Sequence, residues 1–203
     1  MFPTIQDKIT LYNRYAKNYE RRTSGFQRFI KSDYQIFLSN LRGQRIIDLG
    51  AGPGRDSSIF KKASYKPVAL DISDSMLVLC RAKGLKTIKM DIENLVLPDR
   101  SYDGIWSYTS LTTIPKIKVW PIIDGLAKTL TPGGCLFLGL IESDQQGWKL
   151  ADAKYKLKRY TSRYTTQEVI AKLSPHYQLL YFRRLDKTDN GRNTYLNFLW
   201  QLK

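Results

Sequence analysis

The stretch RIIDLGAGPGRDSSIF, residues 45–60, decides the fold. It begins with the apolar run Arg45–Leu49, which carries one acid at Asp48, and continues through glycines at positions 50, 52 and 54. A helix is expected directly afterwards, over residues 56–62. A buried strand that passes through a glycine turn into a helix is typical of the first unit of a wound α/β sheet. The chain is therefore predicted to be an α/β protein.

The segments that follow repeat this alternation of strand and helix. Strands are expected at residues 45–49, 66–71, 85–91, 102–107 and 135–141, with helices at 56–62, 73–84 and 119–130. The tetrapeptide TPGG at 131–134 predicts a turn before the fifth strand. Near the end of the chain, the runs 177–185 and 194–202 flank an Asn-Gly pair, which predicts a tight turn between antiparallel strands. We expect a parallel sheet that ends in an antiparallel hairpin.

The chain is strongly basic, and the excess of positive charge lies toward its ends. Lys and Arg number 33 against 18 Asp and Glu, a net charge of +15, and residues 145–203 hold 12 basic and four acidic side chains. Such charge is typical of a protein that binds nucleic acid or an anionic substrate. It is equally typical of the solvated surface of a protein from a lysine-rich proteome, and both interpretations stay open.

Cysteine content and hydropathy indicate the compartment. Cys80 and Cys135 lie far apart in apolar settings, which fits a reducing environment. No run approaches the roughly 18 apolar residues of a membrane span. The N-terminal MFPTIQDKIT lacks the basic head and apolar middle of a secretory signal. We expect a soluble, cytoplasmic protein without membrane contact.

The glycine turn discriminates between kinds of phosphate and cofactor site. A Walker phosphate loop requires Lys and Ser or Thr after its last glycine, whereas Arg55 and Asp56 follow here. The dinucleotide pattern G-x-G-x-x-G is absent, because the glycines are spaced G-x-G-x-G, and Asp48 would repel a pyrophosphate. The same carboxylate would favour a cofactor that carries an amino acid and a sulfonium centre. A tight turn without any ligand is the remaining alternative.

Acidic residues at the ends of the next two strands extend this site. Asp71 ends the second strand, 23 residues after Asp48, where a carboxylate can accept hydrogen bonds from both ribose hydroxyls. Asp91 ends the third strand, where it can accept from an adenine amino group while Ile92 packs against the ring. Ligands of open α/β sheets bind beyond the carboxyl ends of the strands, so these groups are expected to meet at one edge of the sheet.

These motifs resemble, in order, those of the class I S-adenosylmethionine-dependent methyltransferases. The matching segments are IIDLGAGPGRD, ALDIS, KMDIENLVLPDRSYDGIW and LAKTLTPGGCLFL, and LYNRYAKNYE resembles the Y-x-x-x-A-x-x-Y opening of many small-molecule members. The resemblance covers about residues 10–203 and extends to small bacterial members of the type 11 and type 25 groups, whose substrates are mostly unassigned. It implies a Rossmann-like α/β fold with a seven-stranded mixed sheet in the order 3-2-1-4-5-7-6. It also implies S-adenosylmethionine as cofactor and S-adenosylhomocysteine as product.

On this resemblance, residues 1–203 are expected to form a single methyltransferase domain with four parts. The parts are a helical cap over 1–40 with helices at 4–18 and 25–40, a cofactor-binding core over 41–141, a basic and aromatic substrate-facing insert over 142–164, and a helix with the terminal hairpin over 165–203. Thr165 or Thr166 is expected to cap the helix of 165–173.

The cofactor-binding residues that the resemblance implies stand at the strand ends and in the cap. The backbone at Gly50, Ala51 and Gly52 would approach the cofactor, and Asp48 would lie near its ammonium group. Asp71 would hold the ribose, while Ile72, Asp91 and Ile92 would contact the adenine. Ser107 and Tyr108 would line the methionine or acceptor side, and Tyr12 or Tyr19 would close the pocket. No metal ligand is implied.

Methyl transfer from a sulfonium is an in-line displacement, so the protein mainly has to align the acceptor. A base is required only for an acceptor that is protonated near neutral pH, and the candidates are Glu142, Tyr108 and Tyr19. The only histidine, His176, is expected in an exposed turn. Trp148, Tyr155, Tyr160 and Tyr164 are candidate acceptor contacts, with simple packing as the alternative for each.

Three hypotheses concern the acceptor. The favoured one is a small molecule, anionic in character and methylated on N or O, which the N-terminal helices and the insert would enclose. The second is RNA of the tRNA type, with phosphates bound by Lys154, Lys156, Lys158, Arg159 and Arg163. The third is a non-catalytic subunit that binds the cofactor. The sequence shows no appended RNA-binding domain, which disfavours an RNA acceptor. The lack of an N-P-P-Y-like tetrapeptide disfavours methylation of DNA amines, and the lack of a metal cluster disfavours magnesium-dependent chemistry.

Overall fold

The structure is a computed structural model of the 203-residue chain and describes residues 2–143, 147–152, 157–190 and 193–203. Its main sheet has seven strands in the order β3-β2-β1-β4-β5-β9-β8. The strands are β1 (Arg45–Leu49), β2 (Lys66–Asp71), β3 (Lys86–Lys89), β4 (Tyr102–Tyr108), β5 (Leu130–Ile141), β8 (Tyr177–Leu185) and β9 (Tyr195–Leu202). Counted along the chain within this sheet, the order is 3-2-1-4-5-7-6, and the predicted fold is confirmed.

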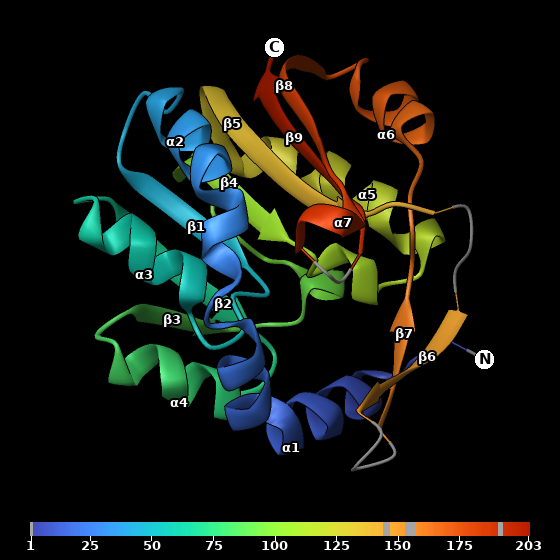
Figure 1. Cartoon of the computed structure of the whole chain (residues 1–203). Coiled ribbons are helices and arrows are strands. Elements are labelled where there is room, and N and C mark those ends of the chain that lie inside the picture. Colours follow the sequence, from blue (N-terminus) through green and yellow to red (C-terminus); the bar gives the residue numbers. More distant parts are fainter. Residues whose placement is uncertain (1, 144–146, 153–156, 191–192) are drawn as a thin grey trace.

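The sheet is parallel from β3 to β5, and β9 joins it antiparallel to both β5 and β8. Helices cover both faces, as Figure 1 shows. Alternate residues of β5 serve the two faces: Leu136 and Leu138 pack into the core beneath α5 (Lys116–Thr129) and α6 (Thr166–Leu173), whereas Phe137 packs into the other core. That second core lies under α2 (Lys31–Ser39) and α3 (Arg55–Lys62). Helices on both faces explain why the central strands β1, β4, β5 and β9 are buried along most of their length, whereas the edge strands β3 and β8 are largely exposed or half-buried.

The N-terminal cap is mainly one long helix. α1 (Ile5–Thr23) begins with a capping box between Thr4 and Asp7 and continues past the predicted end at residue 18. The second predicted helix, 25–40, is divided into a 3₁₀ turn, η1 (Phe26–Ile30), followed by α2. In Figure 1, α1 lies between α4 (Asp74–Ala82), which packs against β2 and β3, and the pair β6 (Gly147–Asp152) and β7 (Leu157–Thr161).

The insert of residues 142–164 contains a strand pair of its own. β6 and β7 pair antiparallel in a separate two-stranded sheet, so they do not extend the main sheet. β7 packs against α1 and against the 3₁₀ turn η3 (Leu111–Thr113) after β4. The pair therefore closes the same side of the molecule as α1. None of the helices that the structure describes combines the length and the apolar character needed to cross a membrane.

Two predicted turns are wrong. TPGG at 131–134 lies within β5 as an irregularity, because Tyr102 of β4 pairs with Leu130 while Gly104 pairs with Cys135. The left-handed φ of +71° at Gly133 lets the extra residues loop out without ending the strand. The connection between β8 and β9 is longer than an Asn-Gly turn, since it contains the short helix α7 (Lys187–Asn190). Asp186 caps the start of this helix, because its Oδ1 accepts a hydrogen bond from the backbone N of Thr188 at 3.0 Å.

Candidate active site

A cavity with about 660 Å³ of empty space lies at the carboxyl ends of the central strands. Most of the expected cofactor-binding residues line it: Tyr12, Tyr19, Gly50, Gly52, Asp71, Ile72, Asp91, Ile92 and Tyr108. The lining also contains eight residues that were not among the expected cofactor contacts: Lys8, Met76, Met90, Thr109, Ser110, Thr113, Ile114 and Arg159. The strand ends and α1 therefore meet at one cavity, here called the cofactor cavity.

The glycine turn forms the floor of the cofactor cavity. Gly50 and Gly52 have φ values of +64° and +55°, in the left-handed region that favours glycine. A Cβ added at Gly50 would lie 2.4 Å from the Cβ of Ser110, so no other residue fits without a shift of the backbone. Glycine at position 50 thus lets Ser110 pack closely on the turn. A Cβ at Gly52 would instead contact only the ring of Tyr19 at 3.7 Å, so the backbone there faces the open cavity, as a bound ligand would require.

Asp71 joins the glycine turn to the start of α4. Its Oδ2 accepts from the backbone N of Gly52 at 2.9 Å, and its Oδ1 accepts from the backbone N of Ser73 at 2.9 Å. Burial raises the pKa of this carboxyl, and the amides of Ser73 and Gly52 oppose the rise. Each carboxylate oxygen keeps a further lone-pair direction, so Asp71 can also accept from two ribose hydroxyls.

Apolar side chains and one acid form the far wall. Ile72, Met76, Met90 and Ile92 supply an apolar slot for a flat ring. Asp91 is fixed at its mouth, because its Oδ1 accepts from the backbone N of Glu93 at 3.2 Å at the start of η2 (Ile92–Asn94). This arrangement fits the predicted recognition of adenine.

Lys8 of α1 fastens the cap to this wall. Its ammonium group forms an ion pair with Glu93, in which both side chains are buried, and Lys118 of α5 reaches the same carboxylate at 2.6 Å. Farther along α1, Asn13 Oδ1 accepts from Ser73 Oγ at 2.7 Å. No local sequence pattern indicates these contacts, because each joins α1 to a residue more than 50 positions away.

A smaller hollow, with about 320 Å³ of empty space, opens below the glycine turn. Asp48, Arg55, Asp56, Ala51 and Tyr19 contribute to its lining. The carboxylate of Asp48 accepts from Ser57 Oγ at 2.6 Å, and burial, together with the nearby Asp56, raises the pKa of its carboxyl to about 8. Asp56 is itself neutralised by Arg55, whose Nε lies 2.5 Å from its Oδ1. The residue left to receive a ligand's ammonium group is Asp48.

The end of β4 differs in part from the prediction. Ser107 is fully buried and shares a hydrogen bond of 2.7 Å with Ser110 Oγ, so that Thr109 and Ser110 line the cofactor cavity in its place. Thr109 has a φ of +63°, a strained conformation for a β-branched residue. The ring of Tyr108 packs between Phe26 and Tyr195, and burial raises the pKa of its hydroxyl well above the usual value. Burial thus disfavours the ionised form of Tyr108 that a base would require.

Two tyrosines of α1 and one arginine of β7 form the wall opposite the strand ends. Tyr12 and Tyr19 meet edge to face, with ring centroids 6.4 Å apart. Burial raises the pKa of Tyr12 to about 12, although the neighbouring Arg159 opposes the rise. Burial would lower the pKa of Arg159, yet it stays above its usual value because the phenols of Tyr12 and Tyr19 lie beside the guanidinium group.

The remaining predicted residues lie elsewhere. Glu142, a candidate base, directly follows β5, forms an ion pair of 2.7 Å with Arg184, and lines none of the cavities described here. Tyr164 is completely buried in the core against Trp120, so packing accounts for its position. Trp148 and Tyr160 meet edge to face at 5.9 Å beside a shallow hollow that Lys8 also lines. Tyr155 lies outside the described residues, and His176 is exposed.

A second cavity, here called the acceptor cavity, adjoins the cofactor cavity and holds about 1070 Å³ of empty space. Four residues line both cavities and form the wall that they share: Tyr12, Tyr19, Thr109 and Arg159. The acceptor cavity continues between α1 and the β5–β9 edge, past Tyr15 and Tyr195, to Arg22. Among the described residues, no cluster of His, Cys, Asp or Glu suited to a metal ion is found.

Comparison with known proteins agrees with the methyltransferase motifs described above. Residues 46–134 match the family model described as a methyltransferase domain. The chain is 27% identical over 158 residues to a malonyl-[acyl-carrier protein] O-methyltransferase of Erwinia billingiae, an alignment that covers 73% of this chain and 61% of the relative. The chain thus spans less than two thirds of that relative's length.

Solved structures share the fold at low sequence identity. The magnesium protoporphyrin IX methyltransferase of Synechocystis, solved with S-adenosylmethionine, superposes with a TM-score of 0.77 at 14% identity, covering 100% of this chain and 99% of that one. The 1,6-didemethyltoxoflavin-N1-methyltransferase of Burkholderia thailandensis, solved with its substrate and S-adenosylhomocysteine, gives 0.73 at 16% identity, covering 100% and 92%. The family model and the shared fold agree with the motifs at the strand ends.

Proposed function

We propose that this chain is a class I S-adenosylmethionine-dependent methyltransferase and that it methylates an N or O atom of a small-molecule acceptor that carries an anionic group, a proposal supported by the methyltransferase domain model matched over residues 46–134 and by the shared fold. The cofactor supplies a methyl group already activated by its sulfonium. In an in-line displacement, the acceptor's lone pair forms the new bond to the methyl carbon, and the electrons of the broken C–S bond remain on sulfur. S-adenosylhomocysteine is the second product.

The observation that carries this proposal is the wall shared by the two cavities. Asp71, Ile72, Asp91 and Ile92 line the cofactor cavity but not the acceptor cavity, whereas Thr109 lines both. A nucleoside held by the first group would leave its methionine end toward the glycine turn and the shared wall. An acceptor in the second cavity would then approach the methyl group from the other side of that wall, and such alignment supplies most of the catalysis that a displacement needs.

The protein's own residues bind, orient and exclude water. Asp71 can accept from the ribose, and Asp48 can receive the ammonium group. Tyr12 and Tyr19 cover the site from α1, while the β6–β7 pair closes it from the side. Shielding from water prevents competing reactions of the activated methyl group.

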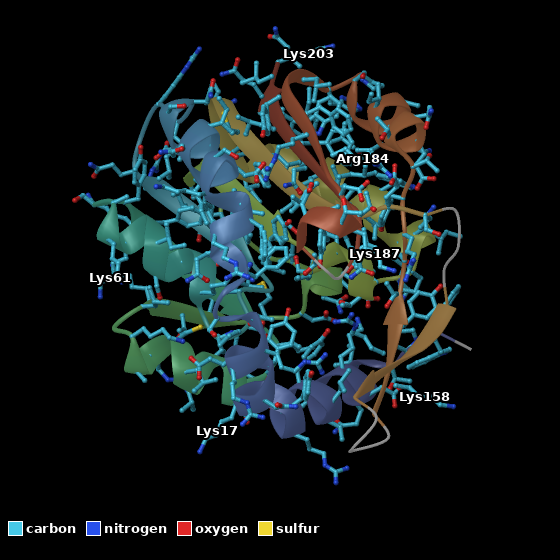
Figure 2. The ribbon with its side chains drawn as sticks, viewed as in Figure 1. Lys17, Lys61, Lys158, Arg184, Lys187 and Lys203 are labelled. Atoms are coloured by element: carbon cyan, nitrogen blue, oxygen red, sulfur yellow. The ribbon has the colours of Figure 1, made fainter. Side chains whose placement is uncertain are left out.

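The alternative of an RNA acceptor receives less support from the basic residues that were predicted to contact phosphates. Arg159 lines the interior cavities, and Arg163 is half-buried. Lys158 is exposed on β7, as Figure 2 shows, and Lys154 and Lys156 lie outside the described residues.

The test uses S-adenosylmethionine with a labelled methyl group and a cell lysate stripped of endogenous cofactor. After incubation, the products are separated into small-molecule, RNA and protein fractions. We expect enzyme-dependent label in the small-molecule fraction. Label that ribonuclease releases would support the RNA alternative, and cofactor binding without label in any fraction would support a non-catalytic subunit.

A further inference from the structure

We infer that the acceptor is an organic carboxylate, that Arg159 holds its carboxylate group, and that this carboxylate is itself methylated to give a methyl ester. The inference rests on the proposed function and names its substrate class. It starts from the charges that line the acceptor cavity and from the place of Arg159 between the two cavities.

The acceptor cavity is lined by cations and neutral polar groups. Arg159 and Arg22 contribute guanidinium groups, and four tyrosines, three threonines and Asn193 contribute neutral side chains. Among the described residues that line it, none is an Asp, Glu or His. A cavity of this composition favours an anion and disfavours an ammonium compound.

Arg159 is half-buried and forms no ion pair with a carboxylate in the part of the chain that the structure describes. Its neighbours in the site are the phenols of Tyr12, Tyr19 and Tyr195. A partly buried charge without an opposite charge is costly, and a bound anion would offset that cost. A guanidinium group also matches a carboxylate geometrically, because two parallel N–H groups can donate to its two oxygens.

The position of Arg159 decides which group of the acceptor is methylated. Arg159 lines the cofactor cavity as well as the acceptor cavity, so an anion bound to it lies at the shared wall. Arg22 is exposed and lines the acceptor cavity but not the cofactor cavity. The body of the acceptor would therefore extend from Arg159 toward Arg22, with its carboxylate nearest to the methyl group.

A carboxylate also removes the need for a base. Its pKa near 4 leaves it ionised at neutral pH, so no proton has to be taken from the attacking oxygen. A carboxylate lone pair forms the O–CH₃ bond, the C–S bond breaks, and its electron pair neutralises the sulfonium. The product ester carries no charge at the former carboxylate, so it loses its attraction to Arg159 and leaves the site more easily than the acid.

The experiment uses the full-length protein, labelled S-adenosylmethionine and a small-molecule extract divided on an anion-exchange column. Products are then treated with mild alkali, which hydrolyses methyl esters to volatile methanol and leaves methyl ethers and N-methyl groups intact. We expect product only from the column-retained acceptors, and we expect alkali to release its label as methanol. Alkali-stable label, or label from unretained acceptors, would overturn the inference while leaving the proposed function in place. Absence of small-molecule label would contradict the proposed function and the inference together.

The variant Arg159→Gln tests the residue. Loss of a charge-assisted, paired hydrogen bond should lower kcat/KM for the retained fraction by about 10- to 100-fold. The Kd for S-adenosylhomocysteine should change less than about twofold, which shows that the site is still folded. Lys158→Gln is the matched control, because it removes the same charge from the adjacent, exposed position and should keep normal kcat/KM. Equal activity of Arg159→Gln and Lys158→Gln would refute the assignment.

Discussion

Replacement of Asp71 tests the cofactor site at its most connected residue. In Asp71→Ala, the backbone N–H groups of Gly52 and Ser73 lose the acceptors that lie 2.9 Å away, and the cofactor loses the acceptor proposed for its ribose. Two hydrogen bonds to a charged acceptor contribute about 1.5–3 kcal/mol each. We therefore expect S-adenosylhomocysteine binding to weaken by about 3–6 kcal/mol, an increase in Kd of about 10²- to 10⁴-fold.

The assay is isothermal titration with S-adenosylhomocysteine and with its 2′,3′-dideoxy analogue. A disordered glycine turn would weaken both ligands equally, whereas a missing ribose contact affects only the ligand that has the hydroxyls. The wild-type protein should prefer the hydroxylated ligand by about 10²-fold or more, and Asp71→Ala should reduce that preference to less than about tenfold. Asp74→Ala is the matched control, because Asp74 stands three positions away, is 58% exposed and pairs with Lys89 outside the cavity. An unchanged preference in Asp71→Ala would refute the ribose assignment.

Three further predictions follow from the same site and its support. Because the carboxyl of Asp48 has a pKa of about 8 and a bound ammonium group favours its ionised form, ligand binding should release a proton. In titrations from pH 6 to 8, the affinity for S-adenosylhomocysteine should therefore rise by up to about tenfold per pH unit. Asp48→Asn should flatten that rise, and an identical slope in both proteins would contradict the role. Gly50→Ala, whose Cβ would meet Ser110 at 2.4 Å, should lose more than about tenfold in affinity, whereas Gly25→Ala, with no atom within 4 Å, should bind normally. Asp33→Ala removes a fully buried partner of Arg183 and should lower the free energy of unfolding in urea by about 3 kcal/mol. The affinity of the folded protein for S-adenosylhomocysteine should not change. A loss of less than about 1 kcal/mol would argue against the importance of this ion pair.

The parts of the site that the sequence predicts are those encoded locally. Gly50 and Gly52 follow the recognisable strand β1, Asp71 is the last residue of β2, and Asp91 lies just after β3. Parallel strands bring their carboxyl ends to one edge, so the meeting of these residues follows from the topology. The structure places all four around one cavity.

The contacts that the sequence did not indicate depend on tertiary packing. Arg159 is predicted from the sequence only as a phosphate contact for RNA; it lines the cofactor cavity because β7 packs on α1. From the sequence alone, Lys8 has the pattern of an exposed lysine on a helix. In the structure, the packing of α1 brings it into an ion pair with Glu93. Tyr164 belongs to an aromatic, basic segment, but its ring fills the core beside Trp120, which no local pattern specifies.

The irregular parts of the strands were predicted least well. TPGG has the composition of a turn, yet pairing of β5 with β4 on both sides of it retains these residues within the strand. Asn190 belongs to the short helix α7, although an Asn-Gly pair favours a two-residue turn. In both places, strand pairing and capping by neighbouring residues prevailed over local propensity.

The most direct test of this account is an experimental structure of the protein with S-adenosylhomocysteine. It should place the ribose hydroxyls within hydrogen-bond distance of Asp71, the adenine between Ile72 and Ile92, and the sulfur facing the wall of Tyr19, Thr109 and Arg159. A ligand bound outside the cofactor cavity, or one whose sulfur faces away from the acceptor cavity, would contradict the proposed route of methyl transfer.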